Sequence, residues 1–409
     1  STLSLWDTYR AAHPLYTLLV PEKVNGFVNS MLSHCDTQGY LPIWALWGKE
    51  NHCMIGNHAI PVIVDAYLKG YKGFDPERAY EAIRKSSLES HPKSDWETYN
   101  QYGYYPFDLI PEESVSRTLE SCYDDYCVAQ MAKELGKKED YNFFSKRARA
   151  YTSLFDPVTK LMRGKDSQGK WREPFDPFRL SHAGTSGGDY TEGNAWQYVW
   201  HVQHDVDSLI EMMGGNKAFT AKLDSLFWLE NNTVNTGFVS DVTGLIGQYA
   251  HGNEPSHHVA YLYNYAGEFW KTQKLIREIF DHFYLPVSDG LCGNDDCGQM
   301  SAWYLFSAMG FYPVDPISKE YIIGAPQLKE MILRLEGGKN FIIRAEGLSE
   351  ENKYVKAVFL NGKELKRFRI FHHEITDGGI LEFIMTDNPS KSFLSLIHIS
   401  EPTRRRGIS

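Results

Sequence analysis

The sequence predicts a mainly helical protein in which paired helices close into a toroid, an (α/α) barrel, followed by a small β-rich domain. Segments with apolar residues at helical spacing follow one another up to Pro313, joined by both short links and long loops. No fixed repeat period is present, which disfavours a solenoid, and the helices are too many for a four-helix bundle. After Pro313 the pattern changes to short β-branched and aromatic runs.

Composition and charge narrow the class of protein. The chain has 409 residues, of which 42% are apolar and 14% aromatic, so it can bury a large core in two or more domains. The formal net charge is −10 and no basic stripe is interleaved with aromatic residues, which argues against nucleic acid as a partner. No apolar run reaches the length of about 18 residues that predicts a membrane span. The six cysteines form no zinc-site pattern.

The predicted helices rest on apolar spacing together with start and stop residues. Pro21 opens one segment that Gly39 ends, and Asp75 with Pro76 caps another. The expected helices cover residues 21–39, about 58–67, the stretch after Asp75-Pro76, and residues 115–126, 140–155, 219–227, 255–266, 269–283 and 300–309. Residues 156–189 are predicted to be irregular.

The second part of the chain is predicted to be a sheet. The expected strands cover residues 321–323, 331–335, 341–345, 355–360 and 381–385, and Asn361-Gly362 is typical of a tight hairpin turn. We therefore divide the chain into a helical domain, residues 1–313, and a β-rich domain, residues 314–392, which carries no catalytic cluster. Residues 393–409 continue no strand pattern, end basic and are interpreted as a tail foreign to the fold.

The N-terminus shows no secretory leader. The chain begins at Ser1 without an initiator methionine, and its first residues lack the charged and then apolar pattern of a signal peptide. We therefore expect a fragment or a processed chain, for which a missing leader does not argue against secretion.

Residues 187–198 join the irregular stretch to a helical one. One side of the expected helix is apolar and comprises Trp196, Val199, Val202, Val206, Leu209 and Met213. We expect Thr191 to cap this helix and Glu192 to lie at its start, where a loop meets the scaffold and catalytic groups often sit. The alternative interpretation is that Glu192 is only a first-turn acid favoured by the helix dipole.

A second polar stretch, Gly252 to His258, also precedes an expected helix. Asn253 and Glu254 come directly before Pro255, and their amide and carboxylate oxygens suit a hard cation such as Ca²⁺. His257 and His258 are consecutive, so on a helix they point about 100° apart and do not share one metal. We expect one of them to contact a sugar hydroxyl or to support the site. A helix start with buried polar caps is the alternative.

The third polar stretch, Gly290 to Gln299, contains two adjacent acids. Asp295 and Asp296 repel each other, so one of them should be held by a hydrogen bond or a cation while the other stays available as a base. A plain surface turn rich in Asn, Asp and Gly is the competing interpretation. Cys292 and Cys297 are spaced so that a small disulfide between them is feasible but not required.

Together these stretches place Glu192 and Asp296 at helix starts of one barrel. An acid and a base of this kind are what glycoside hydrolysis requires, and inverting enzymes separate them by about 6.5–9.5 Å to admit a water. A helix N-terminus lowers the pKa of a carboxyl group, whereas a general acid needs a raised pKa. Burial of Glu192 among Tyr190, Trp196 and bound sugar would have to outweigh the helix dipole.

Six motifs in order along the chain resemble glycoside hydrolase family 92. They are Trp6–Arg10 with His13–Leu15, Asn51–Gly56, Tyr190–Tyr198, Gly252–His258, Gly293–Gln299, and Ser301–Trp303 with Gly310–Pro313. The resemblance covers residues 1–390 and implies an exo-acting, calcium-dependent, inverting α-mannosidase that acts on α-mannoside glycans. It further implies an (α/α)₆ catalytic barrel, an N-terminal β-sandwich domain that this chain lacks, and a bacterial periplasmic, cell-surface or secreted location.

The resemblance also implies catalytic roles. Glu192 matches the general acid of the family and Asp296 matches its general base. A second acid supports the base in family members, and here Asp295, or the amide of Asn294, is offered for that role.

Further positions match the binding site of the family. Asn253 and Glu254 match the loop beside the calcium ion, which contacts the O2 and O3 hydroxyls of the terminal mannose and helps to distort its ring. Trp6, Asp7 and Arg10 match a motif expected near the mannose ring.

Two other functions remain open at this point. A chain without the N-terminal domain exposes apolar surface that this domain covers in the family, so a non-catalytic mannose-binding remnant is one alternative. The other is a different (α/α) barrel enzyme such as a lyase, which would use a Tyr, His or Lys base and stay largely active in Asp296→Asn. The sequence does not fix the mannosidic linkage or the oligomeric state.

Overall fold

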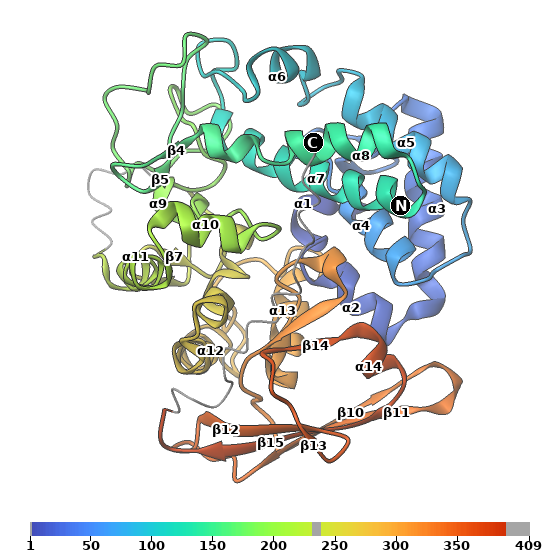
Figure 1. The fold of residues 1–409 in the computed structure, drawn as a ribbon, viewed down its shortest axis with the longest axis vertical. Coiled ribbons are helices and arrows are strands. Elements are labelled where there is room, and N and C mark those ends of the chain that lie inside the picture. The colour runs from blue at the N-terminus through green and yellow to red at the C-terminus, as the bar shows by residue number, and fades with distance from the viewer. Residues whose placement is uncertain (1, 231–238, 390–409) are drawn as a thin grey trace, which may run out of the picture.

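A computed structural model of the chain describes residues 2–230 and 239–389. Helices form the larger part of the molecule, and a β-sheet lies across the lower end of the view in Figure 1. The tail predicted at residues 393–409 lies outside the described residues.

Apolar spacing predicted most of the helices of the described part, but not those at Leu5–Thr8, Ala12–Leu19, Trp96–Tyr102 and His372–Thr376. They are α1 (Leu5–Thr8), α2 (Ala12–Leu19), α3 (Pro21–Gln38), α4 (Ala59–Leu68), α5 (Pro76–Leu88), α6 (Trp96–Tyr102), α7 (Ser114–Glu134), α8 (Lys138–Arg147), α9 (Ala195–Tyr198), α10 (Val206–Met213), α11 (Asn216–Trp228), α12 (Phe269–Phe283), α13 (Gln299–Met309) and α14 (His372–Thr376). The predicted cap of α5 is confirmed, since Asp75 Oδ1 accepts hydrogen bonds from the backbone N–H groups of Glu77 and Arg78. Gly39, with φ 94°, ends α3 as expected.

The helix predicted to begin at Thr191 is different in the structure. Asn194 is the cap: its side chain accepts from the N–H groups of Trp196 and Gln197, while Gln197 Oε1 accepts from the N–H of Asn194. This capping box starts α9 three residues later than predicted. The helix then lasts only four residues, and α10 starts afresh at Val206. Glu192 therefore precedes the helix instead of lying in its first turn.

Two other predicted helices are shorter or tighter than expected. The segment 140–155 leaves the α-helix at Arg147 and continues as a 3₁₀ turn, Ala150–Ser153. The segment 255–266 consists of two 3₁₀ segments, Glu254–Ser256 and Val259–Ala266. Apolar spacing of three to four residues fits both helix types, so periodicity alone does not separate them.

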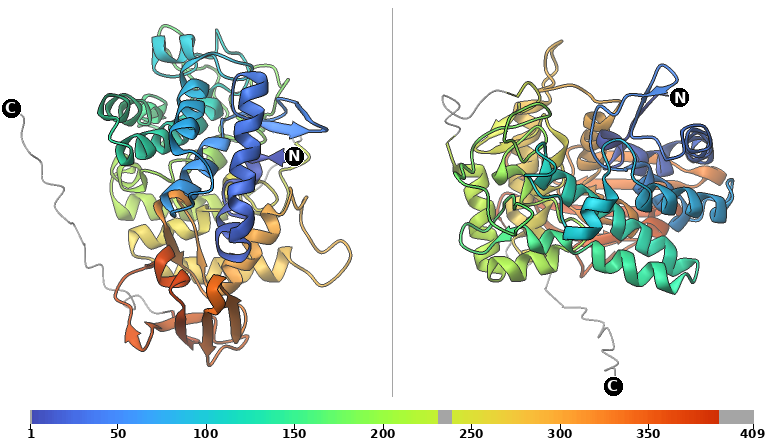
Figure 2. Two further views of the ribbon diagram at one scale, coloured as in Figure 1. Left: turned by 90° about the vertical axis from the view of Figure 1, so that its right-hand side faces the viewer. Right: turned by 90° about the horizontal axis from the view of Figure 1, so that it is seen from above.

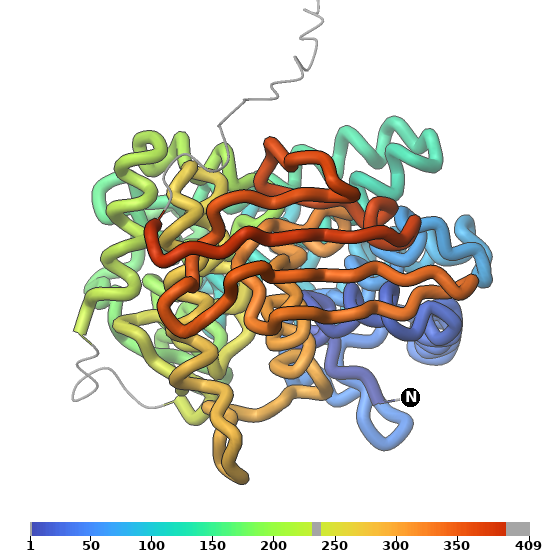
Figure 3. The backbone as a smooth tube through the Cα atoms, turned by 90° about the horizontal axis from the view of Figure 1, so that it is seen from below, coloured from blue at the N-terminus to red at the C-terminus, as the bar shows by residue number. Residues whose placement is uncertain are grey.

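The strands form one main sheet and several short ones. They are β1 (Leu3–Ser4), β2 (Trp44–Leu46), β3 (Lys49–Glu50), β4 (Phe155–Asp156), β5 (Leu161–Met162), β6 (Leu245–Ile246), β7 (Tyr249–Ala250), β8 (Phe311–Tyr312), β9 (Glu320–Ile323), β10 (Glu330–Arg334), β11 (Asn340–Glu346), β12 (Tyr354–Leu360), β13 (Lys363–Glu364), β14 (Arg369–Phe371) and β15 (Gly379–Thr386). The main sheet has the order β10-β11-β15-β12-β13, with only β11 and β15 parallel, and Figure 3 shows its strands side by side.

The predicted hairpin turn is confirmed between β12 and β13. Asn361 and Gly362 both have positive φ, 50° and 77°, as a type I′ turn requires. The sheet packs on the helical part of the molecule, because the core that contains α12 and α13 continues into β11, β12 and β15. Phe383 of β15 closes on Gly310, where an added Cβ would lie 2.8 Å from its ring.

Two loops that lie far apart in the sequence extend from the same face of the molecule. Figure 2 (right) shows the β2–β3 hairpin near the N-terminus and the loop between α12 and α13 on the same side. No helix among residues 2–230 and 239–389 is both long and apolar enough to cross a membrane.

Candidate active site

Three carboxylates from distant parts of the chain meet in the structure. Asp7 lies in α1, Glu254 begins a 3₁₀ segment, and Asp296 lies in the loop before α13. One carboxylate oxygen of each lies within 4.8 Å of the others. Asp7 and Glu254 are buried and Asp296 is half-buried, so this carboxylate cluster reaches from the core to the surface.

Burial and mutual repulsion shift the pKa values of the carboxylate cluster upward. Burial raises the pKa of Asp7 to about 7, with a further contribution from the charge of Asp296. Burial also raises the pKa of Glu254 well above its usual value, and Asp7 and Asp296 add to the shift. The nearby Arg10 guanidinium lowers both pKa values but does not cancel the effect. Three ionised carboxylates at this separation require a further positive charge.

Glu192 lies beside the carboxylate cluster in a polar but largely enclosed position. Its side chain is 12% exposed, and its backbone carbonyl accepts a hydrogen bond from Asn253 Nδ2 at 2.6 Å. Burial, together with the charges of Asp241, Asp7, Asp296 and Glu113, raises the pKa of Glu192 to about 8. The sequence left open whether burial outweighs the helix dipole, and here burial and neighbouring charge prevail.

The backbone is strained at both predicted catalytic residues. Glu192 has φ 48° and Asp296 has φ 47°, in the left-handed region that residues other than glycine seldom adopt. Cys297, next to Asp296, has φ 56°. Such conformations persist only where surrounding structure enforces them, and they concentrate at functional sites.

Two buried acceptor atoms, one in the carboxylate cluster and one on the residue before Glu254, lack a hydrogen-bond partner within the described part of the chain. They are Asn253 Oδ1 and Glu254 Oε1. Buried polar atoms are almost always hydrogen-bonded in folded proteins, so unpaired oxygens mark a place for a ligand or an ion. Amide and carboxylate oxygens are the donor types that Ca²⁺ prefers.

Trp6 and Arg10, predicted to lie near a sugar ring, flank Asp7 of the carboxylate cluster in the sequence. Both are nearly fully buried. The Nε–H of Arg10 donates to the carbonyl of Trp6 at 3.0 Å, and its guanidinium lies over the rings of Trp6 and Tyr9. Asp7, between them in the sequence, is the residue of this motif that reaches the cluster.

His257 and His258, one of which was predicted to contact a sugar hydroxyl or to support the site, are both buried and contact other parts of the chain. His257 Nε2 lies 3.0 Å from the carbonyl of His251, and Gln299 Nε2 donates to its Nδ1. His258 Nε2 lies 2.8 Å from the carbonyl of Trp200. Burial lowers the pKa of both imidazoles to about 3, so both are neutral.

The residues around Asp296 divide into different roles. Asp295 is exposed, and its Oδ1 accepts from the N–H and the hydroxyl of Ser301 in α13, so it is held by hydrogen bonds as one of the two acids was expected to be. Asn294 is exposed at the surface of the loop. Cys292 and Cys297 are free thiols, so the disulfide considered from their spacing is not formed.

Two acids near Glu192 were missed by sequence reasoning. Glu113 is 1% exposed, precedes α7 with φ 59°, and its Oε1 lies 3.8 Å from His182 Nδ1. The other is Asp241, the larger electrostatic contributor to the Glu192 pKa. An acid directly before a long helix was the available signal for Glu113, whereas nothing local marks Asp241.

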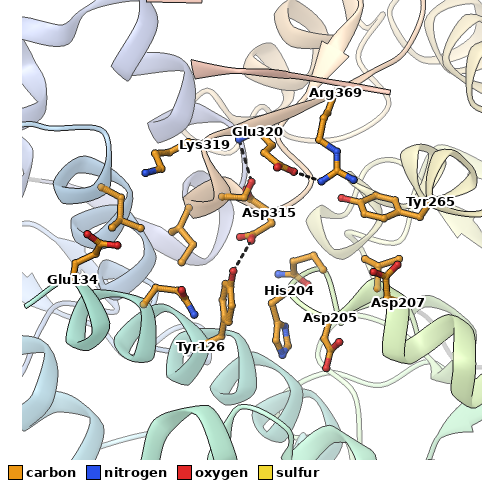
Figure 4. Close-up of a pocket in the computed structure, with 16 residues that line it drawn as sticks. Tyr126, Glu134, His204, Asp205, Asp207, Tyr265, Asp315, Lys319, Glu320 and Arg369 are labelled. Carbon is orange, nitrogen blue, oxygen red and sulfur yellow. Dashed lines mark hydrogen bonds and ion pairs between the residues drawn. The ribbon is translucent and has the colours of Figure 1, made fainter. Parts of the chain in front are cut away.

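A separate cavity of about 400 Å³ contains none of the predicted site residues. It lies between α7, the start of α10 and the segment that leads into β9. Figure 4 shows Tyr126 directed at Asp315, to which it donates at 3.2 Å, and Arg369 paired with Glu320. Two further lining atoms, Gln203 Oε1 and His204 Nδ1, lack a hydrogen-bond partner within the described part of the chain.

Comparisons with known proteins agree with the geometry. The sequence profile of the glycosyl hydrolase family 92 catalytic domain matches residues 1–387. A family GH92 α-mannosidase from Bacteroides thetaiotaomicron, solved in complex with mannoimidazole, is 47% identical with a TM-score of 0.92, over 96% of this chain and 52% of that one. A family GH92 inverting mannosidase from the same organism is 39% identical with a TM-score of 0.86, over 95% and 54%.

A curated relative is an uncharacterized secreted glycosidase of Arthroderma benhamiae, which is 29% identical over an alignment of 417 positions that covers 92% of this chain and 50% of that protein. The chain thus spans about half the length of the relatives that it matches. Because the family profile covers nearly the whole chain, the protein belongs to glycosyl hydrolase family 92, whose catalytic domain it matches.

Proposed function

We propose that the chain is the catalytic part of an exo-acting α-mannosidase that hydrolyses terminal α-linked mannose from glycans with inversion. The observation that carries the proposal is the meeting of Asp7, Glu254 and Asp296 beside a Glu192 carboxyl group whose pKa is raised to about 8. A protonated acid next to an acceptor-rich cluster is the arrangement that glycoside hydrolysis needs. The mannosidases among its structural relatives support mannose as the sugar.

Glu192 is the proposed general acid. At neutral pH its raised pKa keeps the carboxyl group protonated, so it holds a proton ready for the oxygen of the leaving sugar. The hydrogen bond from Asn253 Nδ2 to its carbonyl and its left-handed backbone fix the position of the side chain. Proton transfer from Glu192 leaves an anion that neighbouring acids disfavour, which returns the group to its protonated form after turnover.

Asp296 is the proposed general base. It is half-buried at the open side of the carboxylate cluster, where water has access, and it takes a proton from the water that attacks the anomeric carbon. Asp295 supports it by holding the loop against Ser301 at the start of α13. Inversion requires room for this water between acid and base, at a carboxyl separation of about 6.5–9.5 Å.

Asp7, Asn253 and Glu254 would hold a calcium ion. Their oxygens suit Ca²⁺, and the unpaired Asn253 Oδ1 and Glu254 Oε1 support a ligand at this place. When bound, the ion supplies positive charge that offsets the carboxylates and attracts sugar hydroxyls. Arg10 contributes a second, permanent positive charge from below, which favours the ionised forms of Asp7 and Glu254.

The fold and location that we propose follow the family. Residues 1–313 would form the (α/α)₆ barrel and residues 314–392 the β-rich C-terminal domain. An α-mannoside glycan would be the partner, and the protein would act in the periplasm, at the cell surface or in the medium. The secreted relative from Arthroderma supports a site of action outside the cytoplasm.

Mannose release from α-1,2-, α-1,3-, α-1,4- and α-1,6-mannobiose tests the proposal, measured with calcium, with chelator, and after calcium is restored. We expect release that chelator abolishes and calcium restores, with β-mannose as the first product by NMR. Activity indifferent to chelator contradicts the calcium assignment. Mannose binding without turnover, also after an N-terminal domain is added, favours a binding remnant. Full activity of Asp296→Asn favours a lyase.

A further inference from the structure

A buried carboxylate, Glu120 of α7, gathers several partners beneath the carboxylate cluster. Glu120 is 0% exposed, and its Oε1 accepts a hydrogen bond from the indole Nε1–H of Trp6 at 3.2 Å. Its Oε2 lies 2.8 Å from His58 Nε2 and 3.0 Å from His201 Nε2. The guanidinium of Arg10 lies 3.7 Å from Oε1. None of the sequence motifs pointed to Glu120.

Positively charged side chains in the core compensate the buried negative charge of Glu120. Burial disfavours a charged His58, but Asp124 and Glu120 on its two sides raise its pKa to about 9, so it is an imidazolium at neutral pH. His58 and Arg10 thus face Glu120 and Asp124, two positive groups against two negative ones. Removal of one member leaves its partners buried and uncompensated.

Two of the partners of Glu120 belong to the chain segment that carries Asp7. Trp6 precedes Asp7 directly, Arg10 follows it three residues later, and the Nε–H of Arg10 donates to the carbonyl of Trp6. The segment is therefore attached to α7 on both sides of Asp7. Because Asp7 itself points to Glu254 and Asp296, the attachment determines how far its carboxylate reaches into the cluster.

We propose that Glu120 is a positioning residue of the site: it holds Trp6 and Arg10 so that Asp7 stays within the cluster formed with Glu254 and Asp296. Glu120 does not touch the cluster and acts through Trp6 and Arg10. The expected effects of Glu120 on turnover and on calcium binding rest on the proposed function. The expectation that Glu120 holds Trp6 and Arg10 in place does not.

Helix α7 offers a matched control in Asp125. This carboxylate is also 0% exposed, and it pairs with the buried Arg147 at 2.6 and 2.7 Å. Arg147 is otherwise held by the carbonyl of Ser87 and by Asn100, away from the first ten residues. Asp125→Asn therefore removes one buried charge from the same helix without loosening the Asp7 segment.

The test compares Glu120→Gln with Asp125→Asn in the full chain. Both should lower Tm, because each leaves a buried arginine less compensated. Only Glu120→Gln should speed hydrogen–deuterium exchange of peptides within residues 3–12. Only Glu120→Gln should raise the calcium concentration that half-stabilises the protein in thermal melts, and lower kcat, each by about 10–100-fold, as for residues that orient metal ligands.

The outcomes separate this inference from the proposed function. Unchanged exchange of residues 3–12 in Glu120→Gln, or equal effects of both variants there, overturns the inference, whether or not the parent chain releases mannose. Absence of mannose release by the parent chain contradicts the proposed function alone. If Glu120→Gln does not fold, Glu120→Asp keeps the charge but withdraws it from Trp6, and the same peptides should exchange faster in that variant.

Discussion

The candidate site and the C-terminal sheet differ in how their residues with positive φ and their charged side chains are accommodated. In the sheet, positive φ at Asn361 and Gly362 serves a hairpin turn that requires it, and charges such as Arg344 and Glu330 pair at the exposed surface. At the site, Glu192 and Asp296 adopt positive φ with no hairpin to form, and carboxylates lie next to carboxylates. In the sheet the positive φ angles are those that the turn requires, and opposite charges are paired. At the site the strained backbone and the repulsion between carboxylates remain, and only a bound ligand or a proton reduces that repulsion.

The largest effect on the difference between site and sheet is expected from Glu192→Gln. Loss of the general acid should lower kcat on mannobiose by about 10²–10⁴-fold, the usual contribution of acid–base catalysis. The same change should raise Tm at pH 7. The folded chain holds a proton on the Glu192 carboxyl group that the unfolded chain would release, and an amide at this position removes that cost.

Both effects of Glu192→Gln are measured on one preparation, by steady-state kinetics and by thermal melts. An aryl α-mannoside with a good leaving group is the control, because it needs no proton from Glu192 and should be hydrolysed almost normally. A fall in Tm together with the loss of activity would show that Glu192 is a structural residue.

Calcium should act on the site and leave the sheet unaffected. We expect calcium to raise Tm and chelator to lower it, because an ion bound only by the folded state stabilises that state. In Asp7→Asn the calcium concentration needed for this effect should rise, since one of the proposed carboxylate ligands becomes an amide. Glu330→Gln, a change in the sheet, should leave the calcium response as it is. A Tm that ignores calcium in the parent chain contradicts the metal assignment.

The pH dependence should reveal the raised pKa values of the site. Glu192 must be protonated to act, and its pKa is raised to about 8, so kcat/KM should fall as pH rises through that value. Bound calcium adds positive charge nearby, which favours the carboxylate and should move this limb to lower pH. A profile that stays flat up to pH 9 in calcium and in chelator would remove Glu192 from the role of acid.

The pH dependence of stability should be governed by His58, a different group from the one that governs activity. The pKa of His58 is raised from 6.5 to about 9 in the folded chain, so its contribution is fully present below about pH 6.5 and is lost as pH rises through 9. Thermal melts between pH 6 and 9.5 should show this decline in the parent chain and a weaker one in His58→Gln.

Much of the fold could be predicted from local patterns, whereas the site depends on contacts between distant segments. α3, α5 and α12 followed from apolar spacing and capping residues, and the main strands followed from their composition. The start of α9 was misplaced because Thr191 and Asn194 are both good caps. Only Asn194 has a glutamine three residues later to complete a capping box.

The carboxylate cluster could not be read in the same way. Asp7 and Glu254 lie far apart in the sequence, and the periodicity of apolar residues does not predict that their side chains meet. Glu120 was hidden for another reason: α7 is buried on nearly all sides, so it has no polar face against which a functional acid would stand out. The motifs named Glu192, Asp296, Asn253 and Glu254, but the positions of Trp6 and Arg10 beneath the site needed the structure.

The smallest effect is expected in the sheet, from Asn361→Ala. This change replaces a residue that tolerates positive φ and removes the side-chain acceptor for the N–H of Ile380. Chemical denaturation should show a loss of about 1–2 kcal/mol, the combined cost of one turn conformation and one hydrogen bond. Mannose release per folded molecule and the calcium midpoint should not change, because the turn lies in the sheet and touches no residue of the carboxylate cluster. A fall in kcat with intact folding would show that the sheet and the site are coupled, and the contrast between them would then be one of degree.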